Sequence, residues 1–111
     1  MNDDDPDLDR LLQAVSDRLR RRALSCLGQH EVLTLADLAD ELAEREYGAP
    51  LSEVPPEAVK EIYLTLYHTH VPRLEAEGLV RYDQEQDMVG ITDRGRVVEG
   101  WLDETLDDLR R

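Results

Sequence analysis

Residues 55–91 read PPEAVKEIYLTLYHTHVPRLEAEGLVRYDQEQDMVGI and carry two different hydrophobic periods. Apolar residues first recur at the i, i+3, i+4 spacing of an amphipathic helix, which predicts a helix over 56–77. The double proline suits a first helical turn, and Gly78 suits the left-handed position after a helix. Pro72 lies inside this pattern and predicts a kink or a break near His70. The apolar positions of the helix are Val59, Ile62, Tyr63, Leu66, Tyr67, His70 and Leu74.

The second period alternates between apolar and polar residues. Residues 79–82 and 88–91 each read as a short strand, and the polar segment 83–87 between them reads as a turn. The sequence therefore predicts a β-hairpin directly after the long helix. Thr92 then caps a final helix over 93–111, which carries an apolar stripe.

Two more helical patterns precede the long helix. Residues 8–27 have the amphipathic spacing, and Gly28 is placed to end them. Ser16 and Asp17 in the middle of this segment are good N-cap residues, so it reads as one helix or as two helices that meet there.

A short β-prone pair, Val32 and Leu33, leads into the next helical pattern. Thr34 reads as its N-cap and Asp37 supplies an acidic third position. Residues 48–56, GAPLSEVPP, form the loop that connects this helix to the long one.

The length of 111 residues allows one domain with one core. The order of elements predicts a mainly α fold with a small β-hairpin, namely a winged helix-turn-helix with an extra C-terminal helix. Residues 1–7, MNDDDPD, are expected to be a disordered acidic tail. Residues 8–92 are expected to be the winged-helix domain, and residues 93–111 a C-terminal dimerisation helix.

The charge of the chain is its strongest compositional signal. Acidic residues number 26 against 13 basic ones, and the formal net charge is −13. Lys60 is the single lysine, the other basic residues are arginines, and phenylalanine is absent. Because molar salt shortens the Debye length to about 3 Å, it screens such self-repulsion, so the composition predicts a halophilic protein. An acidic mesophilic protein, or one with a basic partner, is the alternative.

Several segments together resemble a known family. Residues 70–80, HVPRLEAEGLV, resemble the end of the recognition helix in ArsR- and MarR-type winged-helix regulators. Residues 33–39, LTLADLA, resemble their second helix, and residues 16–24, SDRLRRRAL, their first. With residues 66–74, LYHTHVPRL, the set looks most like a haloarchaeal ArsR-related family. The resemblance implies a homodimeric, sequence-specific DNA-binding transcriptional regulator of a halophilic archaeon.

The resemblance also implies a DNA-binding surface on the helix over 56–77. The side chains expected to face the groove are Thr65, His68, Thr69 and Arg73. Those expected to contact phosphates are Lys60, Arg20, Arg21 and Arg22, although the arginines could instead pair with neighbouring acids. The hairpin tip, Asp83-Gln84-Glu85-Gln86-Asp87, departs from the family because it lacks basic residues. A winged-helix protein-interaction module without DNA binding is therefore the alternative function.

The terminal helices are expected to form a homodimer interface, because their apolar stripes exceed what a small core can cover. The predicted interface residues are Leu8, Leu11, Leu12, Val15, Val98, Trp101, Leu102, Leu106 and Leu109.

No pattern in the sequence indicates an enzyme, a cofactor or a metal site. Cys26 reads as a core residue, and a catalytic thiol would need a neighbouring histidine. His68 and His70 lie two positions apart, so a helix points them in different directions. Tyr63 and Tyr67 read as core, or as the wall of a ligand pocket. The acidic N-terminus and the lack of a long apolar run predict a cytoplasmic protein without membrane partners.

Overall fold

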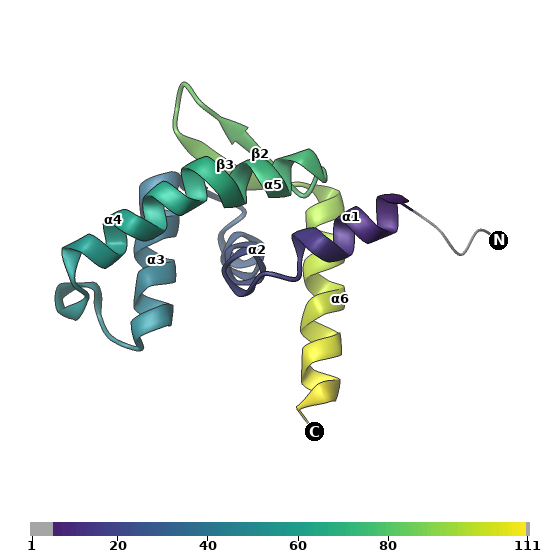
Figure 1. The fold of residues 1–111 in the computed structure, drawn as a ribbon, viewed down its shortest axis with the longest axis horizontal. Helices are drawn as coiled ribbons and strands as arrows, with labels where there is room; N and C mark the ends of the chain where they lie inside the picture. Colours follow the sequence, from purple (N-terminus) through teal and green to yellow (C-terminus); the bar gives the residue numbers. More distant parts are fainter. Residues whose placement is uncertain (1–5, 111) are drawn as a thin grey trace.

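The computed structural model describes residues 6–110 and shows a mainly helical fold with a three-stranded antiparallel sheet (Figure 1). The elements in chain order are α1 (Pro6–Ala14), α2 (Arg18–His30), β1 (Val32–Thr34), α3 (Leu35–Tyr47), the 3₁₀ helix η1 (Leu51–Glu53), α4 (Pro56–Thr65), the π-helical segment η2 (Leu66–His70), α5 (Val71–Ala76), β2 (Val80–Asp83), β3 (Met88–Ile91) and α6 (Asp93–Leu109).

The first amphipathic segment forms two helices. The Asp17 side chain caps α2 by accepting a hydrogen bond from the Arg20 backbone N–H at 3.0 Å. Helix α1 begins at Pro6, so Pro6 and Asp7 belong to a helix and not to the acidic tail predicted over 1–7. Residues 1–5 of that predicted tail lie outside the described residues.

Helix α2 does not end at Gly28, and this prediction was wrong. The helix continues to His30, and Glu31 follows it with a positive φ of 68°. Gly28 lies against α6 instead, because a Cβ atom there would come within 3.1 Å of the Glu99 carboxyl carbon. Gly28 therefore allows α2 and α6 to pack closely, and it does not end α2.

The predicted caps of the other helices are confirmed. Thr34 accepts a hydrogen bond from the Asp37 N–H at 3.1 Å, and Thr92 accepts one from the Gly95 N–H at 2.9 Å. Gly78 has a φ of 73° and lies in a Schellman turn, in which the Leu79 N–H reaches the Leu74 carbonyl at 3.0 Å. Hydrogen bonds between residues close in sequence are therefore enough to set these helix ends.

The long predicted helix is one rod made of α4, η2 and α5 (Figure 1). Its middle turn is π-helical, and the Val71 N–H bonds to the carbonyl of Leu66, five residues back. Pro72 follows at once; it has no N–H, and its ring would crowd the carbonyl four residues back. The helix is irregular near His70, as a π-helical turn within a continuous rod and not as the predicted kink or break.

The sheet has the strand order β1-β3-β2 and is antiparallel throughout. Tyr82 pairs with Val89 in the predicted hairpin, and Leu33 pairs with Val89 from the other side. The hairpin is confirmed, and the β-prone pair before α3 adds the third strand.

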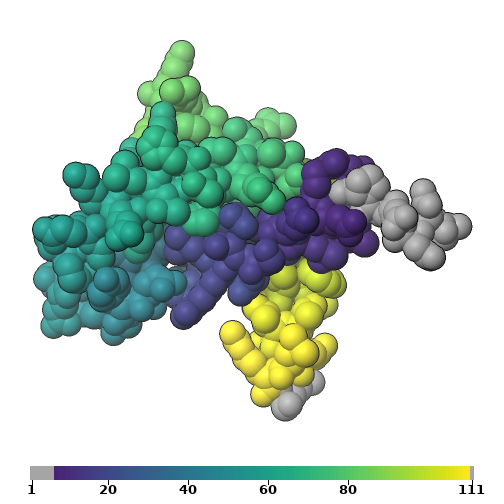
Figure 2. Space-filling model, viewed as in Figure 1, coloured from purple at the N-terminus to yellow at the C-terminus, as the bar shows by residue number. Residues whose placement is uncertain are grey.

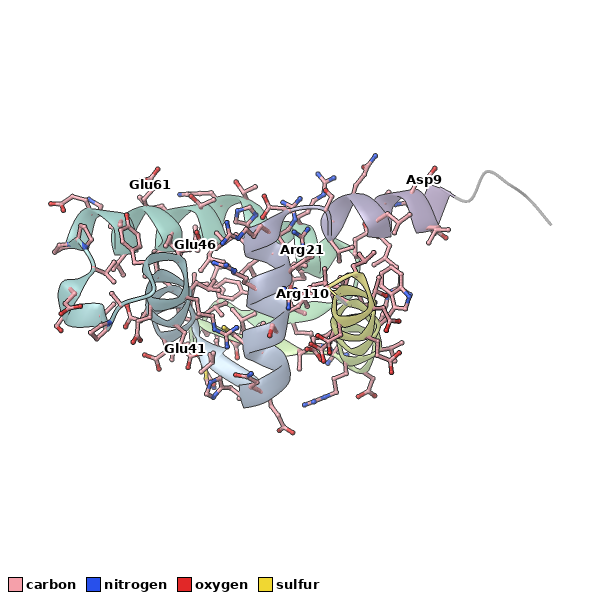
Figure 3. All side chains as sticks on the ribbon, turned by 90° about the horizontal axis from the view of Figure 1, so that it is seen from below. Asp9, Arg21, Glu41, Glu46, Glu61 and Arg110 are labelled. Atoms are coloured by element: carbon pink, nitrogen blue, oxygen red, sulfur yellow. The ribbon has the colours of Figure 1, made fainter. Side chains whose placement is uncertain are left out.

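Helix α2 lies at the centre of the fold, between α3 and α6 (Figure 3). Its residues Leu24 and Leu27 are fully buried, as are Leu38 of α3, Leu66 of η2 and Val89 of β3. The C-terminal half of α6 projects from this body, as the space-filling view shows (Figure 2). Within residues 6–110, no helix is long and apolar enough to cross a membrane.

Candidate nucleic-acid interface

The rod of α4, η2 and α5 buries one face and exposes the other. Its inward side chains, Leu66, His70, Val71 and Leu74, are almost fully buried in the core. Its outward face is exposed, because the apolar residues recur at helical spacing and leave polar residues between them. The buried face holds the rod against the domain and presents the other face to solvent.

A shallow groove of about 370 Å³ runs along the outward face. It is lined by Glu57, Lys60, Glu61, Leu64, Thr65, His68 and Thr69. The structure thus brings together four of the eight residues expected to bind DNA. The hydroxyl of Thr65 donates to the Glu61 carbonyl at 2.8 Å, so its oxygen remains free only to accept.

Arg73 lies further along the rod, beyond the groove lining. It is exposed, and its Nη2 atom lies 3.5 Å from the Gln13 Oε1 atom of α1. This long contact with a neutral amide leaves its charge uncompensated. Arg73 therefore extends the polar surface of the groove toward α1.

The charge around the groove is mixed. Glu57 and Glu61 flank Lys60 on α4. The hairpin tip is acidic, and the carboxylate of Asp83 accepts hydrogen bonds from two backbone N–H groups of the turn, at 3.0 and 3.3 Å. The surface offers few cations for phosphates.

The arginine cluster of α2 does not line the groove. Arg20 donates to the carbonyls of Gln13 and Ala14, and Arg21 donates to the carbonyl of Val15 at 2.9 Å. These carbonyls lie at and just after the end of α1, where the regular i+4 hydrogen bonds of the helix stop. Arg22 makes an ion pair with Glu46 of α3 at 2.5 Å. The three arginines thus bind other parts of the fold, but the predicted pairing with neighbouring acids does not describe them: Arg20 and Arg21 bind carbonyls, and the acid that pairs with Arg22 is Glu46 of α3.

His70 is buried in the same region and is only 7% exposed. Its Nδ1 atom accepts a hydrogen bond from Arg20 at 3.1 Å and lies 4.0 Å from the Asp17 carboxylate. Burial lowers its pKa below the usual 6.5; Asp17 opposes this shift and Arg20 adds to it. His70 is therefore a neutral packing residue that joins η2 to α2.

A cluster of tyrosines that the sequence did not reveal joins α4 to the hairpin. The hydroxyls of Tyr63 and Tyr82 both donate to the carboxylate of Asp87, the former at 3.3 Å. The hydrogen bond to Asp87 is the main cause that raises the pKa of Tyr82. The Tyr67 ring stacks edge-on against Tyr82, with ring centres 6.3 Å apart. The only sequence signal was the helical spacing of Tyr63 and Tyr67.

Two features of residues 6–110 bear on metal and thiol chemistry. No group of three or more His, Cys, Asp or Glu side chains there could hold a metal ion. Cys26 is buried, and this burial raises its thiol pKa to about 11. A thiol with so high a pKa carries almost no thiolate at neutral pH.

The residues predicted for the dimer interface divide into two groups. Val15 and Val98 are buried in the core of one chain, and Leu11 and Leu102 pack against that core, so this part of the prediction needs correction. The pattern of a single helix could not show that these positions pack into the core. The exposed members are Leu8, Leu12, Trp101 and Leu109, and Leu106 is half-buried.

The family comparison covers most of the chain. Residues 12–90 match the domain of unknown function DUF7344, a span from α1 to β3 that includes the groove. No curated protein and no solved structure matches the chain. The chain belongs to the DUF7344 family of domains of unknown function.

Proposed function

We propose that the protein is a winged helix-turn-helix, sequence-specific DNA-binding transcriptional regulator that acts as a homodimer in a halophilic archaeon. Helices α2, α3 and α4 precede the hairpin, and strand β1, placed before α3, pairs with β3. In this assignment α3 and α4 form the helix-turn-helix pair, and β2 with β3 forms the wing. The connection between α3 and α4 contains η1 and is longer than the usual turn of three or four residues.

The observation that carries the proposal is the outward face of the rod, along which the groove runs; we call it the groove face. Lys60, Thr65, His68 and Thr69 lie on one exposed surface of a helical element whose opposite face is anchored in the core. An α-helix fits the major groove of B-DNA, where threonine and histidine can reach base edges. The arrangement supports base contacts from Thr65, His68 and Thr69, with Arg73 beside them.

Phosphate contacts play a smaller role in this proposal. Lys60 and Arg73 are the cations near the groove face, and Glu57 and Glu61 lie beside Lys60. In molar salt, counterion release adds little to affinity, so base contacts and excluded water carry more of it. A halophilic regulator can therefore function with few cations on its reading face. Such a regulator acts on the chromosome, which places it in the cytoplasm.

The homodimer is proposed to form through α1 and α6. Trp101 is 51% exposed and Leu109 is 76% exposed on α6, and Leu8 and Leu12 are exposed on α1. Val97, at 73% exposed, adds a residue that the sequence interpretation left out. Exposed large apolar residues on two terminal helices favour an interface, and a two-fold pair is its commonest form.

The test is selection of DNA sequences from a random pool at about 2 M KCl, where exposed charges are screened to about 3 Å or less. The wild type should enrich one motif, and the Thr69→Ala/Arg73→Ala variant should lose it or bind it about tenfold or more weakly. The matched control is Thr105→Ala/Arg96→Ala on α6, which removes the same residue types away from the groove. No enriched motif, or equal enrichment by wild type and the groove variant, contradicts the proposal.

A second candidate is a winged-helix module that binds a basic protein partner. The observation that favours it is the acidic border of the groove, Glu57 and Glu61, together with the acidic hairpin tip. This candidate predicts that a lysine-rich peptide binds the wild type and that Glu57→Gln/Glu61→Gln weakens the binding. Enrichment of a DNA motif that depends on Thr69 would rule it out as the main function.

A further inference from the structure

A cleft of about 310 Å³ lies between α2 and α6, with one edge formed by α3. Its lining residues are Arg18, Arg21, Arg22, Ser25, Arg45, Glu99, Leu102, Asp103, Leu106 and Arg110. Arg18, Arg21 and Arg22 share one face of α2, because residues three and four apart on a helix are neighbours. Arg21 of α2 and Arg110 after α6 both line the cleft and are labelled in the view from below (Figure 3).

The cleft concentrates positive charge in a chain whose formal net charge is −13. Five arginines line it, against the two carboxylates Glu99 and Asp103. Over the rest of the chain, 24 acidic residues stand against 8 basic ones. The lining of this cleft therefore attracts an anion.

Within residues 6–110, four of the five guanidinium groups have no anionic partner. Arg22 pairs with Glu46, whereas Arg21 binds a backbone carbonyl and Arg45 binds the neutral amide of Gln29 at 3.1 Å. Among residues 6–110, no carboxylate forms an ion pair with Arg18, Arg21, Arg45 or Arg110. Neighbouring cations repel one another, and a bound anion would offset this repulsion.

The cleft also has an apolar wall. Leu102 and Leu106 of α6 line it and are half-buried. A purely inorganic ion would leave this wall exposed to water. The two kinds of lining together fit a molecule with an anionic end and an apolar body.

We propose that this cleft binds a small organic carboxylate, whose carboxylate group contacts Arg18, Arg21 and Arg110 and whose apolar body lies on Leu102 and Leu106. The planar guanidinium fork matches a carboxylate in two parallel hydrogen bonds. The volume lies at the small end of the range for ligand pockets, about 300–1,000 Å³, which suits a compact molecule. The site is separate from the groove face of the rod, so the inference does not depend on DNA binding.

The first test is titration calorimetry of the purified protein with hexanoate, acetate and hexanol as probes. Hexanoate should bind one site per chain. Acetate lacks the apolar body and hexanol lacks the carboxylate, so each should bind at least about tenfold more weakly. Hexyl phosphate in place of hexanoate shows whether the planar carboxylate is preferred. No saturable heat with hexanoate, or equal binding of hexanol, overturns the proposal.

The second test removes the two arginines that have no partner in the described fold. Arg18→Gln/Arg110→Gln should keep the wild-type circular dichroism spectrum and weaken hexanoate binding about tenfold or more. Arg81→Gln, an exposed arginine on β2, is the matched control and should bind like the wild type. Unchanged affinity in the double variant contradicts the assignment.

A measurement on the unmodified protein keeps the proposal testable even if the double variant folds poorly. In amide NMR spectra, hexanoate should shift the signals of Ser25 and Leu106 in the cleft. The signals of Gln84 and Gln86 at the hairpin tip should stay in place. Shifts confined to the hairpin or the groove face would place the ligand elsewhere and overturn the proposal.

Discussion

The Nη1 atom of Arg20 lies 3.1 Å from the Nδ1 atom of His70, although 50 positions separate the two residues in the chain. The same arginine donates to the carbonyls of Gln13 and Ala14 at the end of α1. One side chain of α2 therefore links α1, which carries part of the proposed dimer surface, to η2 in the middle of the proposed reading element. Three helical segments share this contact.

The stability of the fold should depend on the protonation of His70. Its pKa is lowered in the folded state, so the unfolded state binds the proton more tightly. The stability that neutral His70 contributes to the fold is fully present above the usual pKa of 6.5, and it is lost as pH falls from there through the lowered pKa. Urea unfolding at a series of pH values should show this loss, and His70→Gln should flatten it. His68→Gln, at an exposed position, is the control and should keep the wild-type slope.

Replacement of Gly95 by alanine should damage the junction of α6 with the sheet. A Cβ atom there would lie 2.1 Å from the Leu79 carbonyl oxygen and 2.7 Å from a side-chain carbon of Ile91. The overlap should lower the free energy of unfolding by about 1–3 kcal/mol or more. Gly100→Ala on the same helix meets nothing within 4 Å and should stabilise by about 0.5–1 kcal/mol. Equal effects in thermal unfolding would show that α6 packs differently.

The tyrosine cluster should contribute to holding the hairpin against α4. Tyr82→Phe removes a hydrogen bond to the Asp87 carboxylate and should cost about 1–2 kcal/mol in denaturant unfolding. Tyr63→Phe should cost less, because its bond to the same carboxylate is long, at 3.3 Å. Tyr47→Phe, at a position 51% exposed, is the control. A larger loss for Tyr63→Phe than for Tyr82→Phe would contradict this account.

Dimerisation should depend on the exposed apolar residues of α6 and not on the buried ones. Trp101→Asp/Leu109→Asp should yield folded monomers in sedimentation at micromolar concentration, because both side chains face solvent in the single chain. Leu64→Asp, which changes an exposed leucine in the groove, should leave the dimer intact. A wild type that already sediments as a monomer in high salt would refute the proposed interface.

The fold should need salt. Repulsion within a chain of net charge −13 is expected to rival the stability of a small domain, about 5–15 kcal/mol. Cooperative thermal unfolding should be lost below about 0.2 M KCl and return at about 1 M, where the Debye length is about 3 Å. A thermal midpoint that stays constant between these conditions would contradict the halophilic interpretation.

The amino-acid sequence by itself determined where most elements begin and end. Thr34, Thr92 and Gly78 act on backbone groups within a few residues, so their roles follow from local chemistry. The helical and alternating periods likewise predicted the long rod and the hairpin. Pro72 marked the irregular turn, because a missing N–H disturbs a helix wherever the helix lies.

Only the tertiary structure decided which residues meet across the fold. A stripe such as Val98, Trp101 and Leu102 reads as one surface along the chain, yet Val98 lies in the core and Trp101 is exposed. Gly28 looked like a helix end and proved to be a packing position beside Glu99. The arginine cleft and the Arg20–His70 contact have no local signal either. Partners far apart in sequence are chosen by how helices pack, and that choice minimises the energy of the whole chain and not of any one segment.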